Sequence, residues 1–399
     1  MRIRVLINGQ RGEALASALD HLALEQAVRA ACGAARLAKG PAQASFPIDR
    51  TPAPSVPTCF DSVRHCTPQR RAAGVQALVQ VVERSGFRAT GAFETEVTEL
   101  AVANSQGVRR YAPLSTAHLR TVVTSPGGSG YWDMISRDLD AIGPKRIGEL
   151  ASERCASNQR PVVPEPGEYA AVLDYTAVPD LLRFFLLLSF TAPSVQEGRS
   201  FLAQKRGQQV LGQNTSIWDD GADPRTLALP FDSEGVIKRR VDFIHQGVAQ
   251  DLAYDGPSAA KEQCPSTGHA PPFDPEHPWQ RDPLPQNPVL GAGTTTREEL
   301  IASTERGILV TRFHYTHCPD PTQVVATGMT RDGTFLIEQG KIQRACVNLR
   351  FTQSLVQAFQ HVEALTSEQQ LHRDWWGTAA HLVPALKVAR FNFTGATAH

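Results

Sequence analysis

The sequence has no excess of charge of either sign. Its 40 lysines and arginines balance 40 aspartates and glutamates over 399 residues, and only 20% of the residues are charged. Proteins that bind nucleic acid or an anionic membrane surface usually carry a basic excess or a concentrated basic stripe. We therefore expect neither nucleic acid nor a membrane as a partner.

Long apolar runs are also lacking. The longest, residues 181–192, contains Arg183 and is shorter than the roughly 20 apolar residues that a membrane-spanning helix needs. The amino terminus breaks at Asn8-Gly9 before an apolar signal-peptide core can form. Both absences predict a cytoplasmic protein.

Paired cysteines are absent as well. The seven cysteines are scattered and include no Cys-x-x-Cys pair, which argues against a disulfide framework and against a zinc ribbon. Reduced thiols are therefore expected. The 28 prolines and 30 glycines follow no period, which predicts many turns and short strands in an α+β fold.

Recognisable catalytic motifs are missing too. The sequence contains no His-Glu-x-x-His, no Gly-x-Ser-x-Gly, no phosphate-binding loop of the Walker type and no dinucleotide fingerprint. The segment Gly127-Gly128-Ser129-Gly130 could cradle a phosphate at the start of a helix. A flexible turn before a helix explains it as well.

The pattern in the first part of the chain predicts an N-terminal α/β sandwich domain over residues 1–163. Alternating apolar residues before Asn8-Gly9 indicate a β-hairpin. Prolines at 161, 164 and 166 mark the domain boundary, and residues 40–68 should be an extended surface segment. Helices are expected at 19–38, 68–85 and 134–155, and strands at 95–103, 108–114 and 118–124.

Residues 164–399 are expected to form a β-rich domain of antiparallel strands around a buried helix. The helix after Pro179 is apolar all round, so it should be buried on all sides. A capping box at residues 296–299 opens a short helix, and residues 256–288 read as a long surface loop. Strands are predicted at 168–174, 308–315, 324–329, 334–338 and 341–349.

His314, His317 and Cys318 are the tightest group of soft metal ligands in the sequence. Residues three apart in a strand point to opposite faces, so the two histidines could converge on zinc only if the strand breaks at Thr316. Pro319 makes such a break feasible. The alternative is a set of ordinary half-buried residues at the end of a strand.

Other polar and aromatic groups are weaker candidates. The acidic turn at Asp219-Asp220 and Asp223 offers oxygen ligands to a hard cation, or is simply solvated. His361 and His372 have no spaced partner and are interpreted as structural. The pair Trp375-Trp376 belongs either to the core or to a partner surface.

Several motifs together resemble one known family. One matching segment begins at Gly307 and contains the run TRDGTF at 330–335. The other matching motifs are PGEY at 166–169, FDSEG at 231–235, VPAL at 383–386 and FNFT at 391–394. With these motifs the chain resembles the TldD/PmbA family of peptidase-related proteins. The resemblance covers most of the chain and is strongest after Pro166, whereas the family's opening strand–helix unit has no counterpart here.

The resemblance implies a two-subunit zinc metallopeptidase. In this family a TldD subunit holds zinc on a helix through His-Glu-x-x-x-His, and a TldE (PmbA) subunit lacks that motif. The corresponding positions here hold Ser189, Phe190 and Ser194, none of which is a credible zinc ligand or proton carrier. The glycine-rich segment with the metal-binding cysteine of TldD subunits has no match either. The chain is thus TldE-like, with no cofactor of its own and zinc on a TldD-like partner.

The resulting hypothesis is a non-catalytic, TldE-like subunit of a heterodimeric zinc metallopeptidase that hydrolyses unfolded or small peptides. This chain would shape the substrate tunnel, with contacts from Arg312, Arg331, Asp332 and the helix around Ser189. One alternative is a peptide-binding or assembly module without proteolysis. Another is a hydrolase recruited to the maturation of small-molecule or peptide natural products, or one with a relocated site at His314, His317 and Cys318.

Overall fold

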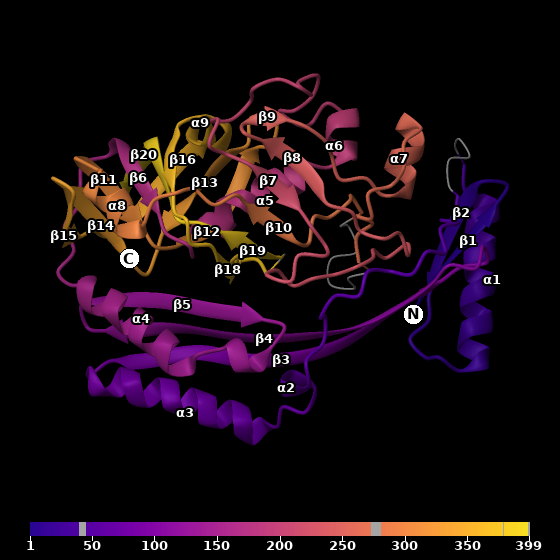
Figure 1. Ribbon diagram of the computed structural model, residues 1–399, viewed down its shortest axis with the longest axis horizontal. Coiled ribbons are helices and arrows are strands. Elements are labelled where there is room, and N and C mark those ends of the chain that lie inside the picture. Colours follow the sequence, from indigo (N-terminus) through magenta and orange to yellow (C-terminus); the bar gives the residue numbers. More distant parts are fainter. Residues whose placement is uncertain (40–44, 273–280, 378, 398–399) are drawn as a thin grey trace.

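The computed structural model describes residues 1–39, 45–272, 281–377 and 379–397. It confirms the α+β class, with a hairpin and helix at one end, a three-stranded sheet with its helices, and a larger β-rich body (Figure 1). Part of the expected Pro-rich segment, residues 40–44, lies outside the described residues. Within the described chain, no helix is both long and apolar enough to cross a membrane.

The chain opens with the expected hairpin. Strands β1 (Arg2–Ile7) and β2 (Gln10–Leu15) pair antiparallel around Asn8 and Gly9, which both have positive φ. Helix α1 (His21–Leu37) packs on this hairpin so closely that a Cβ at Gly12 would lie 2.0 Å from the carbonyl oxygen of Ala31. Only glycine fits between the strand and the helix at that position.

A three-stranded antiparallel sheet follows, in the order β3-β4-β5. Its strands are β3 (Arg88–Ala103), β4 (Arg109–Ser125) and β5 (Gly128–Ser136). Helices α3 (Pro68–Arg84) and α4 (Pro144–Ser157) pack against it, and short helices α2 (Asp61–Arg64) and η1 (Leu139–Ala141) lie nearby.

Two predictions for this region were wrong. The strands expected at 108–114 and 118–124 are one continuous strand, β4. The helix expected at 134–155 begins only at Pro144, because residues 128–136 form β5. The glycines at 127–130 therefore lie at the hairpin turn between β4 and β5 and at the start of β5. No helix begins there, so the phosphate-cradle interpretation, which needed a helix N-terminus, does not apply.

The larger body contains a nine-stranded sheet in the order β12-β13-β16-β20-β6-β11-β14-β15, with β17 also paired to β20. Its pairs are antiparallel except for β6 and β11, which run parallel. The strands are β6 (Gly167–Leu173), β11 (Arg306–Val310), β12 (Phe313–Asp320), β13 (Val325–Thr330), β14 (Thr334–Glu338), β15 (Lys341–Ala345), β16 (Leu349–Ser354), β17 (Val362–Leu365) and β20 (Leu386–Ala396). The single strands expected at 308–315 and 341–349 are each split in two, at residues 311–312 and 346–348.

A six-stranded sheet in the order β18-β19-β10-β7-β8-β9 completes the body. It contains β7 (Ile217–Asp219), β8 (Val241–His245), β9 (Val248–Ala249), β10 (Pro288–Leu290), β18 (Gln370–Arg373) and β19 (Ala380–Val383). Short helices α6 (Ala192–Gln196), α7 (Gly256–Glu262), α8 (Arg297–Ala302) and α9 (Leu355–Gln360) connect the strands. The expected surface loop at 256–288 contains α7 and the buried residues Thr267 and His269, so it is in part a core segment; residues 273–280 lie outside the described part.

Helix α5 (Val178–Leu188) is buried on all sides, as its composition predicted. Its apolar side chains join a core cluster with Phe243 of β8, Phe359 of α9 and Phe391 of β20. Even Asp180 and Arg183 within it are buried. The helix therefore holds the two larger sheets of the body around one core.

Candidate functional site

The positions that the resemblance aligns with the zinc motif of TldD subunits, here called the metal-motif positions, lie where helix α5 ends. Ser189 is the residue after its last turn, and α6 starts only at Ala192, so one continuous helix does not carry all three positions. This corrects the single helix assumed from the sequence. The side chains of Ser189, Phe190 and Ser194 are fully buried.

The neighbours of these residues belong to the core. The Phe190 ring stacks on Phe185 and Phe243, with centroids 5.7 and 4.9 Å apart. The Ser194 hydroxyl lies 2.8 Å from that of Thr191, within hydrogen-bond distance. Zinc in proteins needs convergent imidazole, thiolate or carboxylate ligands. The residues present here do not fit the family's metal.

His314, His317 and Cys318 lie on the edge strand β12, which bulges at Tyr315, a residue with positive φ. The His314 ring contacts Trp375 edge-on at 4.5 Å, and the Cys318 thiol donates to the carbonyl of Asp320 at 3.4 Å. Burial raises the pKa of that thiol to about 11, so it stays protonated. In the described residues, no three His, Cys, Asp or Glu side chains are arranged to hold a metal ion.

The acidic turn is not simply solvated. Asp219 is fully buried and accepts hydrogen bonds from the His269 ring at 3.0 Å and from the backbone N–H of Asn287 at 2.6 Å. Although burial opposes ionisation, the nearby Lys238 ammonium and His269 hold the pKa of this carboxyl well below its usual value. Asp223 pairs instead with Arg225 at 2.6 Å.

Arg312 and Asp332, two predicted substrate contacts, bind each other in the interior. Arg312 donates to the Asp332 carboxylate, and its guanidinium lies 3.8 Å from the Tyr131 ring centroid and 4.8 Å from that of Trp375. Asp332 also accepts from the Ser129 hydroxyl at 2.8 Å. The pair therefore joins the three-stranded sheet to the larger body, whereas Arg331 is exposed.

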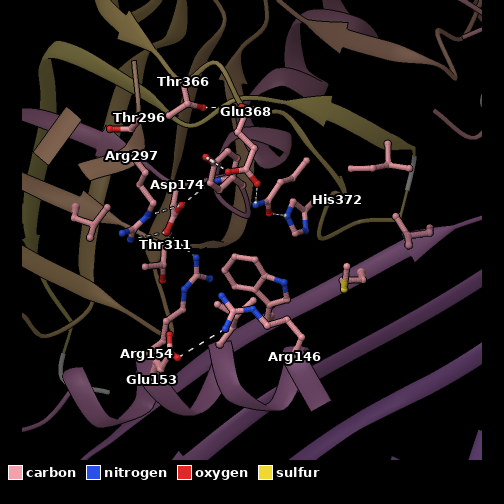
Figure 2. A pocket seen from close by; sticks show the side chains of 18 of the residues that line it. Arg146, Glu153, Arg154, Asp174, Thr296, Arg297, Thr311, Thr366, Glu368 and His372 are labelled. Carbon is pink, nitrogen blue, oxygen red and sulfur yellow. Dashed lines mark hydrogen bonds and ion pairs between the residues drawn. The ribbon is translucent and has the colours of Figure 1, made fainter. Parts of the chain in front are cut away.

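A large cleft separates α4 and β5 from the β-rich body. It has a volume of about 1410 Å³ and is lined by residues of α4, β5, β15, β18 and the start of α8. Figure 2 labels some of them, among them Arg154 of α4, Arg297 of α8 and His372 of β18. Seven arginines and five carboxylates line it, together with apolar side chains such as Trp132, Leu309 and Phe335. None of the three metal-motif positions is among the lining residues.

One wall of the cleft carries an ion-pair network centred on Asp174, at the carboxyl end of β6. Arg154 donates to Asp174 Oδ2 at 2.6 Å, and Arg297 donates to Oδ1 and Oδ2 at 3.2 and 3.0 Å (Figure 2). Burial alone would raise the pKa of this carboxyl, but Arg297 and Arg154 outweigh it and hold the pKa far below its usual value. Two guanidiniums thus share one carboxylate, which leaves the network with net positive charge.

A second polar chain crosses to the opposite side of the cleft. His372 of β18 lies 2.8 Å from Asp133 of β5 through Nδ1 and 3.0 Å from the Gln370 side chain through Nε2. Gln370 donates to Glu368 at 2.7 Å (Figure 2). His372 was interpreted as structural, and its bond to Asp133 does join two sheets, but it also lines the cleft.

Comparison with known proteins identifies the fold family. A family model described as the PmbA/TldA metallopeptidase C-terminal domain matches residues 166–395, more than half of the chain. The chain belongs to the PmbA/TldD family. The resemblance drawn from TRDGTF and its companion motifs is thereby confirmed.

Among relatives, the chain is 24% identical to the metalloprotease PmbA homologue of Haemophilus influenzae, over 97% of this chain and 85% of that protein. It is 37% identical to an uncharacterised protein of Methanocaldococcus jannaschii, but over only 25% of this chain and 24% of that protein. A metalloprotease of Methanothermobacter thermautotrophicus is 22% identical over 65% of this chain and 55% of its own length. The chain thus spans about a quarter of the length of the Methanocaldococcus jannaschii protein and about half of the length of the Methanothermobacter thermautotrophicus protein.

Solved structures with the same fold agree with the architecture. TldE from Thermococcus kodakarensis superposes with a TM-score of 0.88 at 18% identity, over 99% of this chain and 89% of that one. A candidate modulator of a DNA gyrase from Thermotoga maritima gives a TM-score of 0.85 at 18% identity, over 98% and 88%. At such identities the likeness shows the fold alone.

Sequence reasoning missed the cleft of this PmbA/TldD-family chain. Arg154, Asp174 and Arg297 are far apart in sequence and form no motif. One local signal did exist, since the capping box at Thr296 fixes the start of α8 and hence the place of Arg297. No local sequence pattern indicates that α4 would bring Arg154 to the carboxylate of Asp174.

Proposed function

We propose that this chain is the non-catalytic, TldE-like subunit of a heterodimeric zinc metallopeptidase that acts on unfolded or small peptides. The observation that carries the proposal is the state of the metal-motif positions. Ser189, Phe190 and Ser194 are buried in the core at an interruption between α5 and α6. Zinc and the water it activates would therefore belong to a TldD-like partner.

In this proposal the chain contributes binding surface and no metal ligand. The cleft between α4 and the β-rich body is large and mixes arginines with apolar side chains, which suits a peptide better than a small apolar ligand. The exposed Arg331 remains a candidate contact at the partner interface or along the substrate path. The site of the complex is expected to lie in the cytoplasm.

The test is reconstitution of the chain with a TldD-like subunit that carries His-Glu-x-x-x-His. We expect the isolated chain to bind no zinc and to cleave no peptide, and the purified complex to contain one zinc per heterodimer and to cleave unfolded peptides. Native mass spectrometry with metal analysis measures both properties. Stoichiometric zinc on the isolated chain would overturn the assignment. A stable metal-free homo-oligomer that does not bind the TldD-like subunit would favour a binding or assembly module.

Variants of the complex separate a substrate contact from assembly. Arg331→Glu should lower peptidase turnover while the heterodimer still co-purifies, because the side chain is exposed and the substitution leaves the core unchanged. Arg350→Glu, another exposed arginine on β16, serves as the control. Unchanged turnover in Arg331→Glu would remove that residue from the substrate path and leave the subunit assignment intact.

A further inference from the structure

The cleft differs from the metal-motif region in place and in chemistry. It is lined by residues of β5, β15 and β18, each of which ends the strand order of its own sheet. Strands at the end of a sheet can pair with an added extended chain through their outer N–H and C=O groups. Three sheet edges therefore meet at one cavity.

Of these three strands, β15 is the most exposed. On β5 the carbonyl of Tyr131 accepts from Arg154 at 2.9 Å, and on β18 the N–H of Arg373 lies 3.4 Å from the Asp133 carboxylate. On β15, by contrast, residues 341–344 are all exposed. At the end of the strand, the backbone carbonyl of Ala345 accepts a hydrogen bond from the backbone N–H of Val162. An extended ligand would therefore run along β15.

Positive charge marks one end of that path. Helix α8 packs against β15, and Arg297 in its first turn reaches Asp174 through Nε and Nη2. Within the described part of the chain, its Nη1 donates to no protein atom, and its side chain remains 28% exposed to the cleft. Arg154 and Arg297 share the single carboxylate of Asp174, so these three side chains carry one net positive charge, with Glu298 the next carboxylate near Arg297.

We propose that the cleft binds the carboxyl-terminal end of an extended peptide, with the terminal carboxylate on Arg297 and the backbone along β15. The volume of about 1410 Å³ exceeds the roughly 300–1,000 Å³ of most small-ligand pockets, which favours a chain segment over a metabolite. Guanidinium groups bind carboxylates through charge-assisted hydrogen bonds. The choice of a peptide rests on the proposed function, whereas the carboxylate follows from the geometry of Arg297.

The experiment compares two ligands on the purified full-length chain without any partner. They are fluorescently labelled hexapeptides of alanine and valine that end either in a carboxylate or in an amide. Fluorescence anisotropy should show binding of the carboxylate form about tenfold or more tighter than the amide form. Equal or tighter binding of the amide, or no binding of either peptide, would overturn the proposal.

Variants locate the interaction. Arg297→Gln should remove the preference for the carboxylate form, and Arg344→Glu, on the exposed face of β15, should weaken that form more than the amide. Arg350→Gln, on β16 outside the cleft, should behave as wild type. If Arg297→Gln fails to fold, Arg344→Glu still decides the matter, because a carboxylate preference unchanged by that charge reversal would contradict the proposed path.

Photocrosslinking gives an answer that needs no variant. A benzoylphenylalanine next to the peptide carboxylate should label fragments that contain α8, β15 or the end of β6. Labelling confined to other parts of the chain would refute the site. These binding results do not involve the partner subunit, so a failed reconstitution and a failed carboxylate preference are separate outcomes: the first rejects the proposed function and the second rejects this inference.

Discussion

Asp180 lies inside the buried helix α5, where its carboxylate accepts from the backbone N–H of Trp375 at 2.7 Å. Burial raises the pKa of this carboxyl to about 7, and that hydrogen bond offsets the effect only in part. In an unfolded chain the same carboxyl ionises near pH 4. Because the folded state holds the proton longer, this residue lowers the stability progressively as the pH rises from about 4 to about 7.

Replacing Asp180 by Asn removes this titration and keeps an oxygen acceptor for Trp375. We expect Asp180→Asn to increase the free energy of unfolding by about 2–3 kcal/mol more at pH 8 than at pH 5, as measured by urea denaturation. Asp61→Asn, at an exposed position, is the matched control. The same change in stability at both pH values would contradict the assigned burial of the charge.

Single residues also explain what could be predicted about the site. Ser189, Phe190 and Ser194 could be judged unfit for zinc from their chemistry alone, since no fold gives a phenyl ring a proton to transfer. The role of Asp174 could not be judged in this way. Its two arginine partners are brought to it by α4 and α8, and a carboxylate in isolation carries no sign of them.

At the scale of elements, period and turn chemistry predicted the hairpin, α1, α3, β6, α5 and the capped helix α8. One failure lay at residues 128–136, which form strand β5, whereas the sequence predicted a glycine-rich turn followed by a helix from residue 134. Glycine at 130 is needed there because β5 crosses α4 closely: a Cβ on Gly130 would lie 2.2 Å from the carbonyl oxygen of Ala151. A close approach between two elements leaves no local pattern in the sequence, so the sequence offered only a phosphate cradle or a flexible turn for these glycines.

That close approach leads to a prediction. Gly130→Ala should lower the free energy of unfolding by about 1–3 kcal/mol, because the added methyl meets backbone atoms of α4 that must move. Gly127→Ala is the natural comparison, since the nearest atom there is the end of the flexible Gln159 side chain. Chemical denaturation of the two variants measures the difference. A larger loss for Gly127→Ala would show that β5 does not pack on α4 in this way.

On the scale of the whole molecule, the three-stranded sheet meets the β-rich body largely through polar contacts. Ser129 binds Asp332, Asp133 binds His372, and the Arg312 guanidinium covers the Tyr131 ring. These groups lie on β5 and on segments of the body far from it in sequence. Polar and charged side chains thus join β5 to the larger body at several points.

Neutralising one of them should loosen this contact. Asp332→Asn keeps a side chain that tolerates the positive φ of 56° but leaves the buried Arg312 without a charged partner. We expect a loss of about 3 kcal/mol in stability and faster hydrogen exchange in β5 than in α5. Arg331→Gln, one residue away and exposed, should change neither quantity. Equal exchange of β5 in wild type and Asp332→Asn would show that the pair does not hold the sheet.

The sequence by itself determined the α+β class and the family, because composition, local period and short motifs do not depend on distant contacts. Only the tertiary structure decided that β5 replaces a predicted helix start, that Arg312 and Asp332 form an internal pair, and that Arg154, Asp174 and Arg297 share one wall of a cleft. Each of these features comes from segments tens to hundreds of residues apart, which meet only when the sheets and helices pack.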